Sequence, residues 1–211
     1  NVVYSPHIYQ EGIDAGTLED GFARAAAESV ELYRGAPVVT GEWGSSPERA
    51  ADPEDDYFER HLGEQDSYRF GGTIWTWREA CGDAHKYEAA RNDEIPYVWG
   101  FFDVDCATNT INGRRVPLTD VLRKMTVRFA PGPLTEIDWA KDDSELTASG
   151  DDALAGNRLE VFVPNDEPDS VQIESSGLGD VASVPWFGGT LFSASAAGGP
   201  WSLRLEQTAA P

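Results

Sequence analysis

The sequence predicts an α/β unit followed by an all-β unit, and two patterns carry this prediction. In the first part of the chain, short apolar runs alternate with segments of helical periodicity, which is typical of βα units and a parallel sheet. From about residue 128, short alternating runs are separated by Gly, Pro, Asn and Asp, which favours a small antiparallel β-sandwich. We therefore expect two domains, residues 1–127 and residues 128–211.

The elements of the first domain follow from local signals. Thr17 with Asp20 resembles a helix cap, and Gly35 ends the helix that begins there. The expected strands are residues 2–9, 37–44 and 71–79. The expected helices are residues 18–34, 53–65 and 118–124, with an irregular stretch over 80–117. The chain opens inside a strand without a lead-in, so we expect it to be a piece of a longer protein.

The second domain is expected to contain short strands that alternate in polarity. These are residues 134–139, 158–163, 170–175, 190–193 and 201–206. Most of its aromatic residues suit a core. Trp186 and Phe187 precede two glycines in a turn-like context, so they are the best candidates for an exposed pair facing lipid or carbohydrate.

Composition restricts the classes of partner. The 211 residues include 37 Asp and Glu against 16 Lys and Arg, a formal net charge of −21. Phosphates would be repelled by such a surface, so we expect no nucleic acid partner and little affinity for anionic membranes. Seven Trp, seven Tyr and nine Phe supply a packed core. No apolar run is long enough for a transmembrane helix.

Chemically capable side chains lie at the C-terminal ends of the three expected parallel strands. They are His7 with Tyr9, then Glu42, then Trp75 with Trp77. The carboxyl ends of parallel strands meet at one edge, where α/β proteins bind ligands. A carboxylate can attack a sugar's anomeric centre, a phenol can orient it, and an indole can stack on the sugar. Singly, Glu42 could cap a helix and either Trp could be core. Together these residues indicate a glycosidase site.

These same segments resemble a known enzyme family. Residues 4–9, 38–44 and 73–77 are similar to strands six, seven and eight of the (β/α)₈ TIM barrel of glycoside hydrolase family 5. Residues 122–133, followed by a β-sandwich, resemble the endoglycoceramidase-like branch. The resemblance implies the C-terminal part of a TIM barrel, a retaining β-glycoside hydrolase, a carbohydrate or glycolipid substrate, and no cofactor.

The resemblance also implies roles for individual residues. Glu42 would be the catalytic nucleophile, His7 and Tyr9 would border the reacting sugar, and Trp75 would be its stacking platform. Trp77 would be either a second wall or a core residue. The family places its general acid/base in an Asn-Glu-Pro motif, which this sequence lacks. We therefore expect the N-terminal half of the barrel to lie outside this chain, and the chain alone to be inactive.

An enzyme of this kind is expected to be secreted, with any signal peptide upstream. In an exported protein Cys81 and Cys106 would form a disulfide, whereas a reducing compartment would leave two thiols. Cys81 with His85 lacks further ligands, so we expect no metal. Alternative functions stay open: another family 5 β-glucosidase or β-glucanase, a non-catalytic carbohydrate- or lipid-binding module with transient lipid-surface contact, or a sandwich that only supports the barrel.

Overall fold

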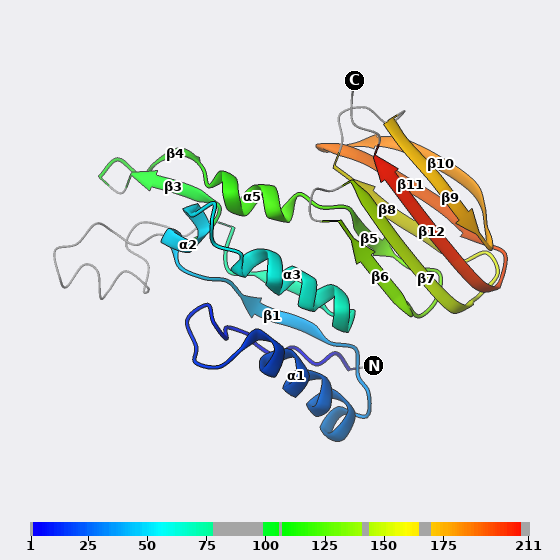
Figure 1. Cartoon of the computed structure of the whole chain (residues 1–211), viewed down its shortest axis with the longest axis horizontal. Coiled ribbons are helices and arrows are strands. Elements are labelled where there is room, and N and C mark those ends of the chain that lie inside the picture. Colours follow the sequence, from blue (N-terminus) through cyan, green and yellow to red (C-terminus); the bar gives the residue numbers. More distant parts are fainter. Residues whose placement is uncertain (1, 78–98, 106, 141–143, 165–169, 208–211) are drawn as a thin grey trace. The chain divides into compact units, whose positions relative to one another are not determined.

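The protein forms two compact units in a computed structural model of the chain (Figure 1). The structure describes residues 2–77, 99–105, 107–140, 144–164 and 170–207. The units are Asn1–Leu122 and Arg123–Pro211. The division precedes the expected boundary at 127–128, because β5 (Thr126–Phe129) pairs with β8 (Arg158–Val163) of the second unit. No helix in the described residues is long and apolar enough to cross a membrane.

Three parallel segments form the sheet of the first unit. β1 (Val39–Trp43) pairs with β2 (Gly71–Ile74) on one side. On its other side it meets the segment around residues 4–8, which is joined through isolated parallel bridges at Tyr4 and His7. The continuous strand expected over residues 2–9 is therefore wrong in detail. Pro6 has no N–H to donate, which limits regular pairing there.

The described residues of the first unit also contain four helices. They are α1 (Leu18–Tyr33), α2 (Pro47–Ala51), α3 (Tyr57–Tyr68) and α5 (Val116–Leu122). The Thr17 hydroxyl accepts a hydrogen bond from the Asp20 amide at 3.1 Å, so the expected cap of α1 is present. Beyond α1, Gly35 has a φ of +73°, a conformation that ends helices.

The helix expected over residues 53–65 starts later than predicted, and α2 was not predicted at all. Asp52 accepts a hydrogen bond from the Glu54 amide, and Asp55 accepts one from the Tyr57 amide, each at 2.9 Å. Such side-chain contacts compete with helical hydrogen bonding and favour turns. They delay the start of α3 to Tyr57.

Within the stretch expected to be irregular, the described residues contain a hairpin. β3 (Phe102–Asp105) and β4 (Thr110–Arg114) pair in antiparallel fashion. The Asp105 carboxylate accepts hydrogen bonds from the Ala107 amide and the Thr108 hydroxyl, which close the turn between the strands. The turn chemistry and the apolar alternation of β3 were present in the sequence, but both strands are short and β4 is exposed along its whole length.

Alternation along the parallel segments divides the first unit into a packed face and a site face. Ile8 and Trp43 are 1% and 2% exposed, and they lie in a core with Phe22, Tyr57 and His61 from α1 and α3. Successive side chains on extended backbone point to opposite faces. The neighbours of Ile8 and Trp43 therefore point away from these helices, which is the geometry that positions the site.

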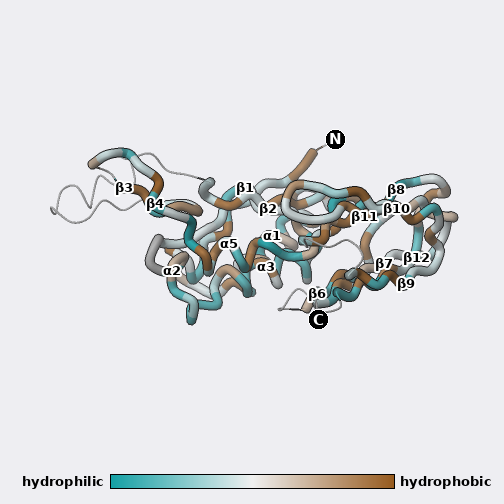
Figure 2. Tube along the Cα trace, turned by 90° about the horizontal axis from the view of Figure 1, so that it is seen from above, coloured by the Kyte–Doolittle hydropathy of each residue, from teal (hydrophilic) through white to brown (hydrophobic). Residues whose placement is uncertain are grey.

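The second unit consists of two antiparallel four-stranded sheets, ordered β10-β11-β8-β5 and β6-β7-β12-β9. Their further strands are β6 (Glu136–Trp139), β7 (Glu145–Ala153), β9 (Val171–Ser176), β10 (Leu178–Trp186), β11 (Gly189–Ala196) and β12 (Gly199–Gln207). Val161, Phe192, Leu146 and Leu205 from both sheets share one core. In Figure 2 polar and apolar stretches alternate along this unit. The prediction of antiparallel sheets is confirmed.

Three strands of this unit were not predicted: β5, β7 and β10. β7 buries Ala148, which has only a methyl group, and Gly150, which has no side chain, so both give little hydrophobic signal. β10 is an edge strand, and the residues after Leu178 are all exposed, so it lacks a buried face that alternation could reveal. A strand that is held mainly by backbone pairing shows little pattern of apolar residues in its sequence.

Candidate active site

The candidate site lies where the first parallel segment and β1 end. The Ile8 amide donates a hydrogen bond to the Glu42 carbonyl oxygen at 3.0 Å, and His7 bridges Glu42 in parallel register. This pairing aligns His7 and Tyr9 with Glu42. Because Ile8 is buried beneath the helices, its two neighbours share the opposite face with Glu42.

The Glu42 side chain is held by two neighbouring groups. His7 Nδ1 lies 2.8 Å from Glu42 Oε2, which is a hydrogen-bonding distance. The Tyr9 hydroxyl is also hydrogen-bonded to the Glu42 carboxylate. Burial raises the pKa of Tyr9, and the negative charges of Glu42 and Asp14 raise it further. Tyr9 therefore keeps its proton and acts as the donor, while the Glu42 side chain remains 26% exposed.

A buried imidazole lies behind the site and joins its two strands. His61 Nε2 lies 3.3 Å from the Ile8 carbonyl oxygen, and the His61 ring stacks on Trp43 with centroids 4.0 Å apart. The Gln65 side-chain nitrogen lies 3.0 Å from His61 Nδ1, so Nδ1 accepts and Nε2 donates to Ile8. Burial lowers the pKa of His61 to about 4. A neutral His61 thus fixes the residues adjacent to Tyr9 and Glu42.

The end of β1 is fixed by a second set of contacts. The buried Tyr57 hydroxyl donates to the Gly44 carbonyl oxygen at 2.9 Å, and the Ser45 hydroxyl donates to the Gly12 carbonyl oxygen at 3.1 Å. A Cβ on Gly44 would lie 2.5 Å from the Trp75 carbonyl oxygen, closer than packing allows. Glycine is therefore required where β1 passes the residue that follows β2.

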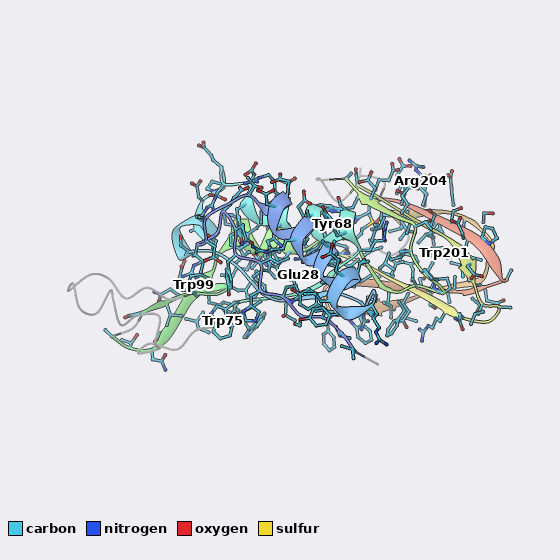
Figure 3. All side chains as sticks on the ribbon, turned by 90° about the horizontal axis from the view of Figure 1, so that it is seen from below. Glu28, Tyr68, Trp75, Trp99, Trp201 and Arg204 are labelled. Carbon is cyan, nitrogen blue, oxygen red and sulfur yellow. The ribbon has the colours of Figure 1, made fainter. Side chains whose placement is uncertain are left out.

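Two indoles lie at this end of the unit. The Trp75 amide donates to the Trp43 carbonyl oxygen at 2.7 Å, which places Trp75 beside the end of β1, and its bond to Thr76 is cis. Trp99 is 7% exposed and meets Tyr9 edge-on, with centroids 6.4 Å apart. Figure 3 shows Trp75 and Trp99 toward the same end of the first unit. Sequence reasoning missed Trp99, because no local pattern connects it with Tyr9.

Trp77 belongs to a separate aromatic surface. The strand expected over residues 71–79 ends at Ile74, so Trp77 lies beyond it. Trp77 is 69% exposed, and its ring centroid lies 5.4 Å from that of Phe101 and 5.1 Å from that of Phe102. A hydrogen bond from the Phe101 amide to the Trp77 carbonyl fixes this cluster.

The remaining predictions concern a disulfide and a metal site. Cys81 and Cys106 lie outside the described residues, so their predicted disulfide stays a prediction. In the described ranges no three His, Cys, Asp or Glu side chains are grouped so that they could hold a metal ion. Chemically, the described part of the site offers the partly exposed Glu42 carboxylate, two side chains that orient it and the Trp75 indole nearby.

Structural comparison first gives the class of protein. No model of a protein family matches the chain, and no curated protein matches it in sequence. Solved structures of glycoside hydrolases, however, share its fold. An endogalactoceramidase matches 98% of this chain and 42% of its own, with a TM-score of 0.74 and 29% sequence identity. The resemblance to endoglycoceramidases that the sequence indicated is confirmed.

Two further structures share the fold at lower identity. Endo-glycoceramidase II from Rhodococcus sp. has a TM-score of 0.62 and 20% identity over 98% of this chain and 43% of its own. Sterylglucosidase 1 from Cryptococcus neoformans has a TM-score of 0.60 and 13% identity over 90% of this chain and 31% of its own. The chain spans less than half the length of these proteins, consistent with the C-terminal part of an endoglycoceramidase-like enzyme.

Proposed function

We propose that this chain is the nucleophile-bearing part of a retaining β-glycoside hydrolase of family 5 that removes the glycan from a glycolipid. The observation that carries the proposal is Glu42, held between His7 and Tyr9 at the ends of adjacent parallel segments. In this proposal the segment around residues 4–8, β1 and β2 correspond to barrel strands six, seven and eight. The two sheets of the second unit form the β-sandwich that follows the barrel.

The geometry suits double displacement. The Glu42 carboxylate attacks the anomeric carbon and forms a glycosyl ester while the bond to the leaving oxygen breaks. Water then attacks the same carbon, gives a proton to the acid/base residue that protonated the leaving oxygen, and releases Glu42. Hydrogen bonds from His7 and Tyr9 hold the carboxylate in position, and Trp75 offers an apolar surface for the sugar. The leaving oxygen needs a proton, which we assign to an acid in the remaining part of the barrel.

A glycolipid is the substrate class best supported. The endogalactoceramidase that is 29% identical to this chain is named for a glycolipid substrate. The cluster of Trp77, Phe101 and Phe102 adds exposed aromatic surface in the same unit, which suits an apolar aglycone. A β-glucosidase or β-glucanase of the same family is the second candidate, because the Glu42 site would serve it equally.

The proposal predicts that the chain alone is inactive and becomes active when completed. We expect no turnover of aryl β-glycosides by the 211-residue chain, because a retaining site needs two carboxyl groups about 5 Å apart. A chimera in which the chain replaces the matching segment of the endogalactoceramidase is expected to hydrolyse aryl β-glycosides and glycolipid. Turnover by the chain alone that is lost in Glu42→Gln, or a folded, substrate-binding chimera without turnover, would contradict the proposal.

The role of Tyr9 can be tested separately. Tyr9→Phe in the chimera is expected to lower kcat about 10- to 100-fold, since a hydrogen bond to a charged group is worth about 1.5–3 kcal/mol. Tyr4→Phe is the matched control, because Tyr4 also donates to a carboxylate, that of Glu28, but from the opposite end of the segment. An unchanged kcat in Tyr9→Phe, measured under substrate saturation, would show that Tyr9 does not position Glu42 for the reaction.

A further inference from the structure

The β10–β11 hairpin of the second unit ends in an exposed aromatic pair. Phe187 is 90% exposed and Trp186 is 47% exposed at the turn between the strands. Val184, at 50% exposure, lies two residues before Trp186 on the same face of β10 and continues the apolar surface. Since β10 is the edge strand of its sheet, this surface lies at a margin of the unit that is open to a partner.

The stretch of sequence that contains this pair has no charged residue. A quarter of the chain's residues are charged, yet Val181–Leu203 contains no Asp, Glu, Lys or Arg. This segment includes most of β10, all of β11 and the beginning of β12. Moving charged groups out of water costs much free energy. A segment without them can therefore enter a less polar environment with a small desolvation cost. Within this segment β11 is largely buried, while the β10 residues and the turn are exposed. This exposed part, which presents aromatic rings and no charge, indicates a surface that leaves water on binding.

Arg128 supplies a cation beside this pair. Its guanidinium carbon lies 5.4 Å from the centroid of the Trp186 ring, while the Phe187 ring meets Trp186 edge-on at 6.0 Å. The guanidinium occupies one face of the indole, which makes Trp186 a poor platform for a sugar. Arg next to Trp suits a bilayer interface, where phosphates lie directly above apolar chains.

We propose that the β10–β11 hairpin is a membrane-interface element that places Trp186 and Phe187 among lipid headgroups, with Arg128 against a phosphate. The net charge of −21 opposes approach to an anionic bilayer, so the expected surface is zwitterionic. This inference goes beyond the proposed hydrolase function and does not depend on it, because it concerns only residues of the second unit. Binding is expected to be reversible, since few side chains enter the interface.

The test is flotation of the full chain with phosphatidylcholine vesicles. The double variant Trp186→Ser with Phe187→Ser is expected to lower the partition constant about tenfold or more, because two large apolar side chains are removed. Leu154→Ser is the matched control, since Leu154 is 67% exposed between β7 and β8 of the same unit. It is expected to bind as the unaltered chain does. Adding phosphatidylserine is expected to weaken binding.

A second measurement locates the contact. Phosphatidylcholine brominated in its acyl chains is expected to quench part of the chain's tryptophan fluorescence, and that part should disappear in Trp186→Phe, which keeps an aromatic ring. Both variants should retain the circular dichroism of the unaltered chain, because the altered side chains are exposed. The proposal is overturned if the chain does not float, if the double variant floats equally well, or if the hairpin instead mediates self-association or binding to soluble oligosaccharides.

Discussion

Replacing Glu42 by Gln in the completed enzyme is expected to lower kcat by about 10⁴-fold or more, the scale seen when a catalytic nucleophile is removed. Gln keeps the shape and the hydrogen-bonding capacity toward His7 and Tyr9, but an amide oxygen does not form the glycosyl ester. KM should change much less than kcat. The measurement is steady-state hydrolysis of aryl β-glycosides by the chimera.

The control variant is Glu28→Gln. Glu28 on α1 also accepts a hydrogen bond from a tyrosine, Tyr4, but that pair lies at the start of the parallel segment rather than at its end. We expect its kcat to stay within about twofold of the unaltered value, as is usual for partly exposed substitutions away from a site. Equal losses in both variants would show a general effect of carboxylate removal and would contradict the assignment of Glu42.

The product formed by a rescued variant gives an independent assignment of the role of Glu42. With a dinitrophenyl β-glycoside, whose leaving group needs no proton, Glu42→Ala is expected to recover turnover when azide is added. Azide would enter from the face that Glu42 vacates, form a bond to the anomeric carbon and expel the phenolate, giving the α-glycosyl azide. A β-glycosyl azide would instead identify Glu42 as the acid/base residue.

Acid is expected to loosen the strand pair behind the site through His61. The pKa of His61 is about 4 in the folded chain and about 6.5 when unfolded, so the unfolded chain binds the proton first as pH falls. Stability contributed by neutral His61 is complete above pH 6.5 and is lost as pH falls toward 4. Between pH 7 and pH 4.5 the loss is roughly 2.5 kcal/mol, or about 10²-fold in a local opening equilibrium.

Hydrogen exchange measures this loss directly. The Ile8 amide donates to the Glu42 carbonyl, so its protection, corrected for the intrinsic exchange rate, reports the pairing of the two segments. His61→Gln keeps a donor for the Ile8 carbonyl but does not titrate. In His61→Gln the Ile8 amide is expected to be less protected from exchange at pH 7 than in the unaltered chain. It is also expected to lose less of that protection on acidification. An equal loss of Ile8 protection on acidification in His61→Gln and in the unaltered chain would refute the role of His61.

Local chemistry made several elements predictable. α1 begins after the cap at Thr17 and ends before Gly35, which has a positive φ. Its limits therefore lie within one residue of the expected range. β8 has the bounds that its alternation indicated. The exposed position of Trp186 and Phe187 also followed from sequence, since two glycines after an aromatic pair favour a turn. In each case the residues that decide the structure are neighbours in the chain.

Elements held by distant partners were not predictable in this way. β5 and β10 are edge strands whose pairing with β8 and β11 supplies most of their order. Trp99 reaches Tyr9 from far along the chain, and no periodicity in the sequence marks that contact. Only the folded arrangement shows that His61 is fully buried between Ile8 and Trp43.

The sequence by itself determined the residue types of the site and their place at strand ends, because side-chain alternation and turn chemistry are local properties. It also indicated the resemblance to endoglycoceramidases. Only the tertiary structure decided that His7 and Tyr9 contact Glu42, that His61 fixes them from behind, and that Trp77 leaves the strand for an aromatic surface of its own. Those facts depend on the register of paired strands and on packing between residues far apart in sequence, which local patterns do not specify.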